Sequence, residues 1–351
     1  MGALPNKLTG FQDVEDDEVR AKFEGAWDCE IPATNGWNLT EMFEAMERDE
    51  LKAVYCIGEN PADSEADVKH ARAMLERLDV LVVQDVFLTR TAQMADVVLP
   101  AALGWAESDG TVTNSERRVQ RMRAAIPPPG EARQEIGIIN DLAAQMGDGG
   151  WGNPTAEELW EELRTVSPMH AGMSWERLEG EGGIQWPCPT EDHPGSPFLH
   201  GRLWERPAGG RLAPFSCVED RRPLDELSDE FPLRLTTVRA LDSYNTGVQT
   251  DKYSSPIRTG EALEISPADA ADLGVVEGER VNVSSRRGAI EMTIGIDQHL
   301  AVGLCHTTFH FPETTDINQI TSDAVDPKSG TAEFKAAAVR VDKLVKVATG
   351  A

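Results

Sequence analysis

The sequence has few basic residues for its length. Its 351 residues include 33 Lys and Arg against 60 Asp and Glu, which gives a formal net charge of -27 at pH 7. A nucleic-acid backbone needs a basic protein face, so this composition excludes nucleic acid as an expected partner. The chain is long enough for two domains with separate cores.

Lysine is the scarcer of the two cations, with 9 of the 33 basic residues. In concentrated salt, screening weakens the repulsion between carboxylates, and hydrated carboxylates keep a protein dissolved. The composition therefore indicates a salt-adapted (halophilic) protein. An acidic protein of ordinary salt conditions is the alternative.

Cysteine is also scarce. The five cysteines, at positions 29, 56, 188, 217 and 305, form no C-x-x-C pair. Their spacing therefore excludes a recognisable zinc site or iron–sulfur ligand set. We expect most of them to be buried thiols of a cytosolic protein.

Long apolar runs are absent as well. No segment reaches the ~20 apolar residues that cross a membrane as a helix. The N-terminus has no basic stretch followed by an apolar core. The sequence therefore predicts a cytoplasmic protein without direct membrane insertion.

The first half of the chain has the pattern of repeated strand–helix units. Its predicted strands are continuously apolar rather than alternating, which is typical of a parallel sheet covered on both faces in an α/β domain. The predicted strands are 51–57, 80–83 and 96–100, and the predicted helices are 64–78, 89–94, 131–146 and 155–166.

The pattern changes from Phe231 onward. Short alternating strands separated by glycine turns, with one short helix at 267–273, predict a small double-psi-like β-barrel. A stretch rich in Pro, Gly and charge precedes it. We therefore predict domains at 1–170 and 231–351, joined by a linker at 171–230.

Polar residues follow the first two predicted strands. Gly-Glu-Asn occupies 58–60, and Gln-Asp occupies 84–85 with Thr89 one turn later. Ligands of open α/β sheets bind beyond the carboxyl ends of the strands. Glycine lets the backbone approach a ligand, and carboxylate and amide groups pair with ribose hydroxyls or a purine edge. Ordinary turns and helix caps are the alternative interpretation.

Neither of these turns has the G-x-G-x-x-G or G-x-x-x-x-G-K-[ST] pattern, which disfavours standard NAD and ATP binding. No Ser/His/Asp order suggests a hydrolase. His306 and His310 lie four residues apart on an expected strand. We interpret them as packed or hydrogen-bonded side chains rather than metal ligands.

Three long motifs occur in a fixed order within residues 55–120. They are G-E-N-P at 58–61, Q-D-x-F-x-T-x-T-A at 84–92 and D-G-T-x-T-N-x-E-R-R at 109–118. In this order they resemble the catalytic (alpha) subunits of molybdopterin-dependent formate dehydrogenases, here of haloarchaeal type. Residues 1–6, 183–189 and 235–341 also resemble parts of these subunits. The resemblance covers nearly the whole chain, but only the later half of the family protein.

The resemblance implies a parallel-sheet molybdopterin-binding domain followed by a dinucleotide-binding barrel. It implies two copies of molybdopterin guanine dinucleotide with Mo or W, and two-electron oxidation of formate to carbon dioxide. One guanosine diphosphate arm would contact Gly58, Glu59, Asn60, Gln84, Asp85, Thr89 and Asp109. Pterin or phosphate groups would contact Arg239, Tyr244, Thr246, His310, Asn318 and Lys335.

The match departs from the family in two ways. Family members carry one or two histidines just after the arginine, where this chain has Ser243 and Asn245. The family's 4Fe-4S cysteines, metal-ligating Cys or selenocysteine, adjacent His and catalytic Arg all precede the segment that matches Met1. The arginine-rich loop at 116–118 is a candidate for a role in the fold instead of ligand binding.

We therefore expect this chain alone to be inactive on formate. The resemblance implies as partners the N-terminal half of the catalytic subunit and iron–sulfur or diaphorase electron-transfer subunits. Two alternatives stay open. One is another molybdopterin oxidoreductase such as a nitrate reductase, and the other is a non-catalytic scaffold like the cofactor-free homologue in respiratory complex I.

Overall fold

The computed structural model describes residues 4–149, 151–200, 215–241, 243–247, 260–327 and 330–344. The chain forms two compact units, and neither is continuous in sequence. The first comprises Met1–Asn38 and Pro100–Glu219, and the second comprises Leu39–Leu99 and Asp220–Ala351. These units divide the chain at other points than the predicted domains 1–170 and 231–351.

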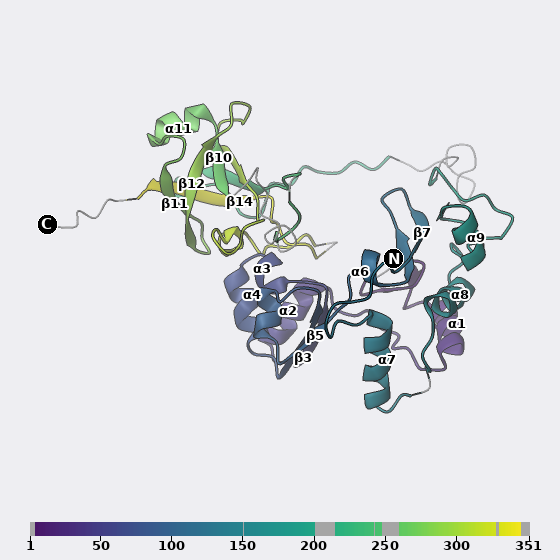
Figure 1. The fold of residues 1–351 in the computed structure, drawn as a ribbon. Coiled ribbons are helices and arrows are strands. Elements are labelled where there is room, and N and C mark those ends of the chain that lie inside the picture. The colour runs from purple at the N-terminus through teal and green to yellow at the C-terminus, as the bar shows by residue number, and fades with distance from the viewer. Residues whose placement is uncertain are drawn as a thin grey trace. The chain divides into compact units, whose positions relative to one another are not determined.

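The second unit contains the predicted α/β layer. Strand β3 (Ala53–Ile57) pairs in parallel with β4 (Val80–Asp85), and β4 is also the neighbour of β5 (Val97–Pro100). Figure 1 shows the helices α2, α3 and α4 gathered beside these strands. The helices of this layer are α2 (Leu39–Glu47), α3 (Pro61–Ser64), α4 (Val68–Leu75) and α5 (Arg90–Met94).

The helices bury one face of this sheet. Leu81 and Val83 of β4 pack with Ala92 of α5, and a neighbouring cluster joins α2 to α4. Ile57 and Val97 stay 44% and 46% exposed, so the described residues leave part of this sheet surface uncovered. The expectation that both faces of the sheet are covered stays a prediction.

The predicted helix at 64–78 is the shorter helix α4, Val68–Leu75, in the structure, and a separate helix precedes it. Helix α3 ends at Ser64, and α4 begins after Asp67, whose backbone has φ +44°. The Asp67 side chain accepts from the backbone N–H of His70 and caps α4. Aspartate tolerates the left-handed conformation better than most residues, so the chain turns here.

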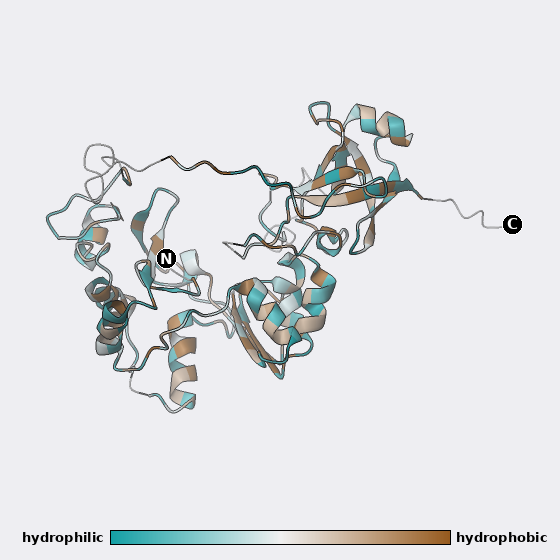
Figure 2. Cartoon of the chain, turned by 180° about the vertical axis from the view of Figure 1, so that it is seen from behind, coloured by the Kyte–Doolittle hydropathy of each residue, from teal (hydrophilic) through white to brown (hydrophobic). Residues whose placement is uncertain are grey.

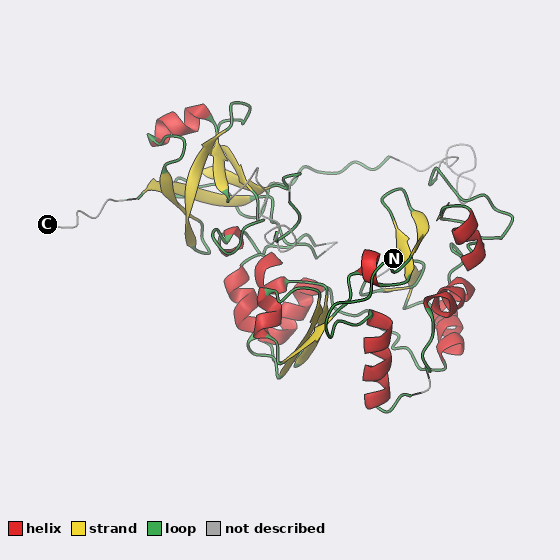
Figure 3. Ribbon diagram, viewed as in Figure 1, coloured by secondary structure: helices red, strands yellow, loops and turns green. Residues whose placement is uncertain are grey.

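The second part of this unit is the predicted barrel. Six strands close in the order β10-β12-β11-β14-β9-β13, with parallel pairs β10–β12 and β13–β9. Figure 3 shows these strands with α11 at their edge. The strands are β9 (Leu233–Thr237), β10 (Ala262–Ile265), β11 (Arg280–Ser284), β12 (Ala289–Ile296), β13 (Leu304–Thr307) and β14 (Ala337–Lys343), and the helices are α11 (Pro267–Leu273) and the 3-10 turn η2 (Ile317–Gln319).

The barrel interior is a single apolar core. Leu235, Leu263, Ile294 and Val339 are fully buried or nearly so and belong to one cluster. Hydrophobic and hydrophilic residues lie side by side along the barrel strands (Figure 2), as expected when one face points inward and the other to solvent.

The first unit contains a second, antiparallel sheet that the sequence analysis did not predict. Strand β7 pairs with β6 and with β8, and Trp160 of α8 packs against this sheet together with Met173 and Ile184. The strands are β1 (Lys7–Leu8), β2 (Gln12–Asp13), β6 (Gly110–Thr113), β7 (Arg118–Met122) and β8 (Ile184–Gln185), and the helices are α1 (Asp17–Trp27), α6 (Gly104–Glu107), α7 (Glu135–Gln145), α8 (Ala156–Val166) and α9 (Trp175–Gly180).

The loop at 116–118 stabilises this unit. Arg117 has φ +67° and donates to the carbonyl oxygens of Trp186 and Ser196. Arg118 pairs with Glu116 at 2.7 Å. Helix α9 and strand β8 lie inside the predicted linker 171–230, so its first residues belong to a packed core.

The expectation that most cysteines are buried was wrong. Cys188 and Cys305 are buried and Cys56 is intermediate, but Cys29 and Cys217 are exposed. The exposed pair lies in segments without regular structure, where no apolar core is available. Within the described ranges, no helix has the length and hydropathy needed to cross a membrane.

Candidate functional site

The first group of predicted site residues lies at the carboxyl ends of β3 and β4, and we call it the strand-end site (residues 58–60, 84, 85 and 89). The backbone N–H of Gly58 donates to the carbonyl oxygen of Gln84 at 2.9 Å, which joins the two strand ends. Gly58 has φ +65°, and no atom lies within 4 Å of the position a Cβ would take. The turn is therefore open on its glycine side, with space for a ligand against the backbone.

Gln84 is the most enclosed member of the strand-end site. Its side chain is fully buried, and its Oε1 accepts from the hydroxyl of Tyr55. Its Nε2 is buried and has no hydrogen-bond partner. A buried amide N–H without a partner costs free energy, so this donor is available for an acceptor group of a ligand.

Three carboxylates give this site a negative electrostatic character. Burial raises the pKa of Glu59, and the nearby Asp85 raises it further. Burial also raises the pKa of Asp85. Burial raises the pKa of Glu65 to about 7, with a smaller contribution from the charge of Glu59. Asp85 accepts from the backbone N–H of Phe87 at 2.9 Å, and further hydroxyl or N–H groups from a ligand would stabilise the ionised forms of these carboxylates.

The two other residues of the strand-end site already have protein partners. The Asn60 side chain donates to Asp63 at 3.0 Å and accepts from the hydroxyl of Thr91 at 2.8 Å. Thr89 caps α5, because its hydroxyl accepts from the backbone N–H of Ala92 at 3.1 Å. The structure gives both residues the capping and turn roles that the alternative interpretation proposed, which leaves their contact with a ligand a prediction.

The second group lies at one end of the barrel, and we call it the barrel site (residues 239, 244, 246, 310 and 335). Lys335 donates from Nζ to the carbonyl oxygen of Thr237 at 2.6 Å. Burial lowers the pKa of Lys335, and the positive charge of Arg239 lowers it further. The Arg239 guanidinium lies 4.6 Å from the ring centre of Tyr244. Two cations that repel each other here favour an anion as ligand.

His310 is the most buried member of the barrel site. It is 2% exposed, its Nε2 accepts from the backbone N–H of Ala240 at 3.1 Å, and its Nδ1 bonds with the carbonyl of Asn245. Thr246 beside it is 7% exposed. His306 lies with its Nε2 3.7 Å from the Asp297 carboxylate.

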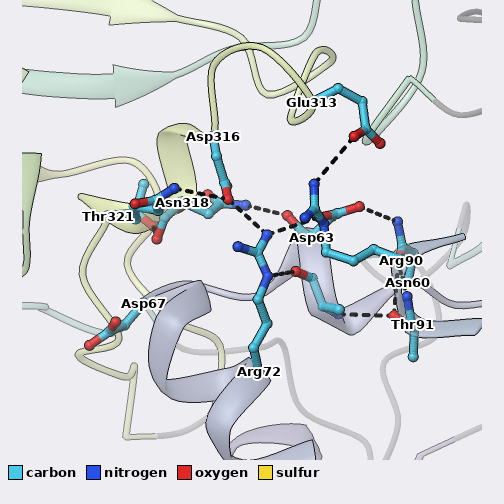
Figure 4. A network of polar contacts seen from close by, with 12 residues as sticks. Asn60, Asp63, Asp67, Arg72, Arg90, Thr91, Glu313, Asp316, Asn318 and Thr321 are labelled. Atoms are coloured by element: carbon cyan, nitrogen blue, oxygen red, sulfur yellow. Dashed lines mark hydrogen bonds and ion pairs between the residues drawn. The ribbon is translucent and has the colours of Figure 1, made fainter. Parts of the chain in front are cut away.

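Asn318 lies away from the barrel site. Its Nδ2 donates to the carbonyl oxygen of Asp63 at 2.9 Å, and its side chain is almost fully buried. Figure 4 shows Asn318 pointing toward Asp63 among several charged side chains. In this position the Asn318 amide joins two parts of the protein, and its predicted contact with a pterin edge stays untested.

Asp109 belongs to the first unit, whereas all the other predicted site residues belong to the second. Its Oδ1 accepts from the backbone N–H of Ala124 at 3.2 Å. It lines a cavity of about 750 Å³ together with Arg121 and Trp175. The structure therefore brings together the strand-end residues with one another and the barrel residues with one another, and Asp109 is part of the other unit.

Sequence reasoning missed the residues that support these sites. Tyr55 orients Gln84, and Asp63 joins Asn60 to two arginines, Arg72 and Arg90. Arg72 is on the polar side of a predicted helix, where a side chain is ordinarily expected to be exposed to solvent. No signal in the sequence alone would have found its partners.

Comparison with known protein families matches both parts of the chain. Residues 3–145 match the family described as Molybdopterin oxidoreductase. Residues 233–338 match the family described as Molydopterin dinucleotide binding domain. The second match covers most of the closed barrel.

Characterised relatives match nearly the whole chain. The alpha subunit of F420-dependent formate dehydrogenase 2 from Methanococcus maripaludis is 42% identical over 98% of this chain and 50% of its own length. The catalytic subunit of assimilatory nitrate reductase from Bacillus subtilis is 33% identical over 97% of this chain and 49% of its own length. The chain thus spans about half the length of these relatives.

A solved structure has a similar fold. Acetylene hydratase from Pelobacter acetylenicus superimposes with a TM-score of 0.67 at 22% identity, over 89% of this chain and 47% of that protein. At this identity the likeness concerns the fold alone. The fold, the two domain matches and the relatives agree in their direction, and the chain is similar to molybdopterin oxidoreductases in both parts.

Proposed function

We propose that this chain is the cofactor-binding part of a formate dehydrogenase catalytic subunit and binds molybdopterin guanine dinucleotide. The observation that carries the proposal is a division of charge within the second unit. The strand-end site presents carboxylates whose pKa values are raised and one unpaired amide donor, whereas the barrel site presents two cations. A dinucleotide needs both, because its nucleoside end has hydroxyl and N–H donors and its pyrophosphate is anionic.

The strand-end site fits the guanosine end. A guanine edge presents N–H donors beside a carbonyl acceptor, and ribose presents hydroxyls. Asp85 and Glu59 can accept from these donors, and the unpaired Nε2 of Gln84 can donate to the carbonyl. The open backbone at Gly58 allows the flat base to approach without a steric clash. A phosphate placed here would be repelled by the carboxylates.

The barrel site fits phosphate or pterin groups. Arg239 and Lys335 supply the positive charge, and an anion between them would relieve their mutual repulsion. The Tyr244 ring, already in contact with the Arg239 guanidinium, limits the positions that this cation can take. When bound, the cofactor supplies a metal centre, Mo or W, for two-electron exchange with a small substrate, and the protein supplies its position and electrostatic surroundings.

The residues that react with formate lie, in this proposal, in the half of the relatives that this chain does not match. That half would contribute the metal-ligating Cys or selenocysteine, the adjacent His, the catalytic Arg and the 4Fe-4S cluster, together with a second copy of the cofactor. Iron–sulfur or diaphorase subunits would accept the electrons. The exposed apolar side chains Ile57, Val97 and Val98 support a further protein partner beside this sheet.

A nitrate reductase is the second candidate, because such a relative matches at 33% identity over nearly the same residues. The higher identity of the formate dehydrogenase relative, 42%, favours formate. Assays of the assembled enzyme with formate and with nitrate distinguish the two.

The proposal is tested by Asp85→Ala in the enzyme assembled from this chain and its complementing half. Removing the acceptor leaves a buried hydroxyl or N–H unpaired, at a cost of roughly 1 to 3 kcal/mol, or about 5- to 150-fold in affinity. We expect the purified variant to have lost guanine nucleotide and metal, measured by mass spectrometry after release. Asp342→Asn on the barrel surface is the control, and cofactor content equal to wild type in Asp85→Ala contradicts the proposal.

A further inference from the structure

The two parts of the second unit have separate apolar cores. One core surrounds Leu235 and Ile294 in the barrel, and another surrounds Phe43 and Met74 in the α/β layer. Among the described residues, no apolar cluster contains side chains from both parts. Hydrogen bonds and ion pairs join the two parts, and these can be changed without opening either core.

Asp63 is the centre of this polar junction. Its carboxylate is 1% exposed. It accepts from Nη2 of Arg72 at 3.0 Å, from Nε of Arg90 at 2.5 Å and from Nδ2 of Asn60 at 3.0 Å. A buried carboxylate is tolerated only with such partners, because an unpaired charge in the interior is costly.

The same two arginines contact the barrel, as Figure 4 shows. Arg72 donates from Nη2 to Asp316 at 2.7 Å, and Arg90 donates from Nη2 to Glu313 at 3.3 Å. Asn318 adds its bond to the Asp63 carbonyl oxygen at 2.9 Å. Each arginine thus bridges the α/β layer and one barrel loop, residues 313–318.

Both ends of this junction continue into the candidate sites. On one side, Asn60 is a member of the strand-end site and shares Asp63 with the arginines. On the other side, His310 of the barrel site lies only three residues before the barrel loop 313–318 in the chain. A movement at the junction therefore changes the spacing between the two sites.

We propose that the junction of Asp63, Arg72, Arg90 and Asp316 is a positioning device that fixes the spacing between the strand-end site and the barrel site. This inference rests on the proposed function, in which one ligand engages both sites. For a ligand with two attachment points, the second attachment is strong only if its site is held at the matching distance. The four residues touch no ligand in this scheme and act through the sites they hold apart.

The proposal is tested in the full 351-residue chain with Asp316→Asn. This variant removes the barrel carboxylate but leaves Arg72 paired with Asp63, so both cores stay intact. Guanosine reports on the strand-end site alone, and molybdopterin guanine dinucleotide reports on both sites together. We expect the dissociation constant of guanosine to stay within about twofold of wild type, while the intact cofactor binds roughly tenfold or more weakly.

A loss of the same size for both ligands means that Asp316 only stabilises the fold, and overturns the proposal. Unchanged binding of the intact cofactor overturns it as well. The exposed pair Arg340 and Asp342, 2.7 Å apart on β14, gives the matched control. Asp342→Asn should leave the dissociation constants of both ligands unchanged.

Amide hydrogen exchange tests the junction without any ligand. In Asp316→Asn we expect faster exchange at 311–318 and at 58–63 together, with the barrel strands protected as in wild type. Faster exchange at 311–318 alone would show that the two sites are not coupled. If wild type does not bind guanosine but exchange at 311–318 and at 58–63 still rises together in Asp316→Asn, the proposed function fails and the junction stands.

Discussion

Replacement of Glu65 by glutamine should stabilise the protein at alkaline pH and have a much smaller effect at acidic pH. Glu65 follows α3, is mostly buried, and lies close enough to Glu59 for the two charges to repel. An unfolded glutamate ionises near its ordinary pKa of 4.5, whereas the folded protein keeps the proton until about pH 7. The folded state therefore binds more protons in this interval, and its stability falls as the pH rises.

The magnitude follows from the two pKa values. From 4.5 to about 7, the shift corresponds to roughly 3 kcal/mol of destabilisation above pH 7. At pH 5.5 the same linkage leaves a destabilisation of about 1 kcal/mol. Glutamine has the same shape but no proton to lose, so the variant does not carry this pH-dependent penalty.

The measurement is urea denaturation of wild type and Glu65→Gln at pH 5.5 and pH 8, at constant potassium chloride. The variant should be more stable than wild type at both pH values, and its advantage in unfolding free energy should be about 2 kcal/mol larger at pH 8 than at pH 5.5. Burial lowers the pKa of His170 to about 4, so its own contribution is lost on acidification below pH 6.5, but it cancels between the two proteins. A difference that does not change with pH would refute the assigned environment of Glu65.

Three further outcomes are expected. Gly172→Ala should unfold the first unit or destabilise it by more than ~1 to 3 kcal/mol, because the new Cβ would lie 2.0 Å from the Thr190 carbonyl oxygen. Gly25 lies in helix α1, and no atom lies within 4 Å of the position its Cβ would take, so Gly25→Ala should stabilise the protein by about 0.5 to 1 kcal/mol. Thermal or urea unfolding measures both changes. If the acidic surface is a salt adaptation, circular dichroism should report increasing structure as potassium chloride rises from dilute to molar concentration, and full cooperative folding in dilute buffer would contradict it. The purified chain should reduce no dye with formate and should gain this activity with its complementing half; formate oxidation by the chain alone would show that the reacting residues are in these 351 residues.

Local signals were sufficient for several elements. Helix α11 occupies the predicted residues 267–273 because Ser266 caps it, Pro267 begins it and Gly274 ends it with φ +67°. The parallel strands and the barrel could be predicted for the same reason, since their apolar periodicity and their turns lie within short windows. The strand-end site followed from the rule that ligands bind beyond the carboxyl ends of parallel strands.

Long-range partners were the limit of the prediction. Strand β8 has two residues, and it is a strand only because β7, far earlier in the chain, pairs with it. Asn318 and its partner Asp63 are 255 residues apart, so no local pattern could distinguish a ligand contact from a bond within the protein. The exposed cysteines and the exposed apolar residues of the sheet had the same cause, because composition does not report which neighbours a chain has.

The interleaved units have a consequence for how the protein is synthesised. The α/β layer of the second unit is complete at Leu99, but residues 100–219 of the other unit must follow before the barrel begins. At usual rates the ribosome takes on the order of ten seconds to make such a stretch. Strand β14 pairs with both β9 and β11, so the barrel closes only when Ala337–Lys343 have emerged. Until then Asp63, Arg72 and Arg90 lack their partner Asp316. A chaperone can bind the nascent chain during this interval and prevent its aggregation.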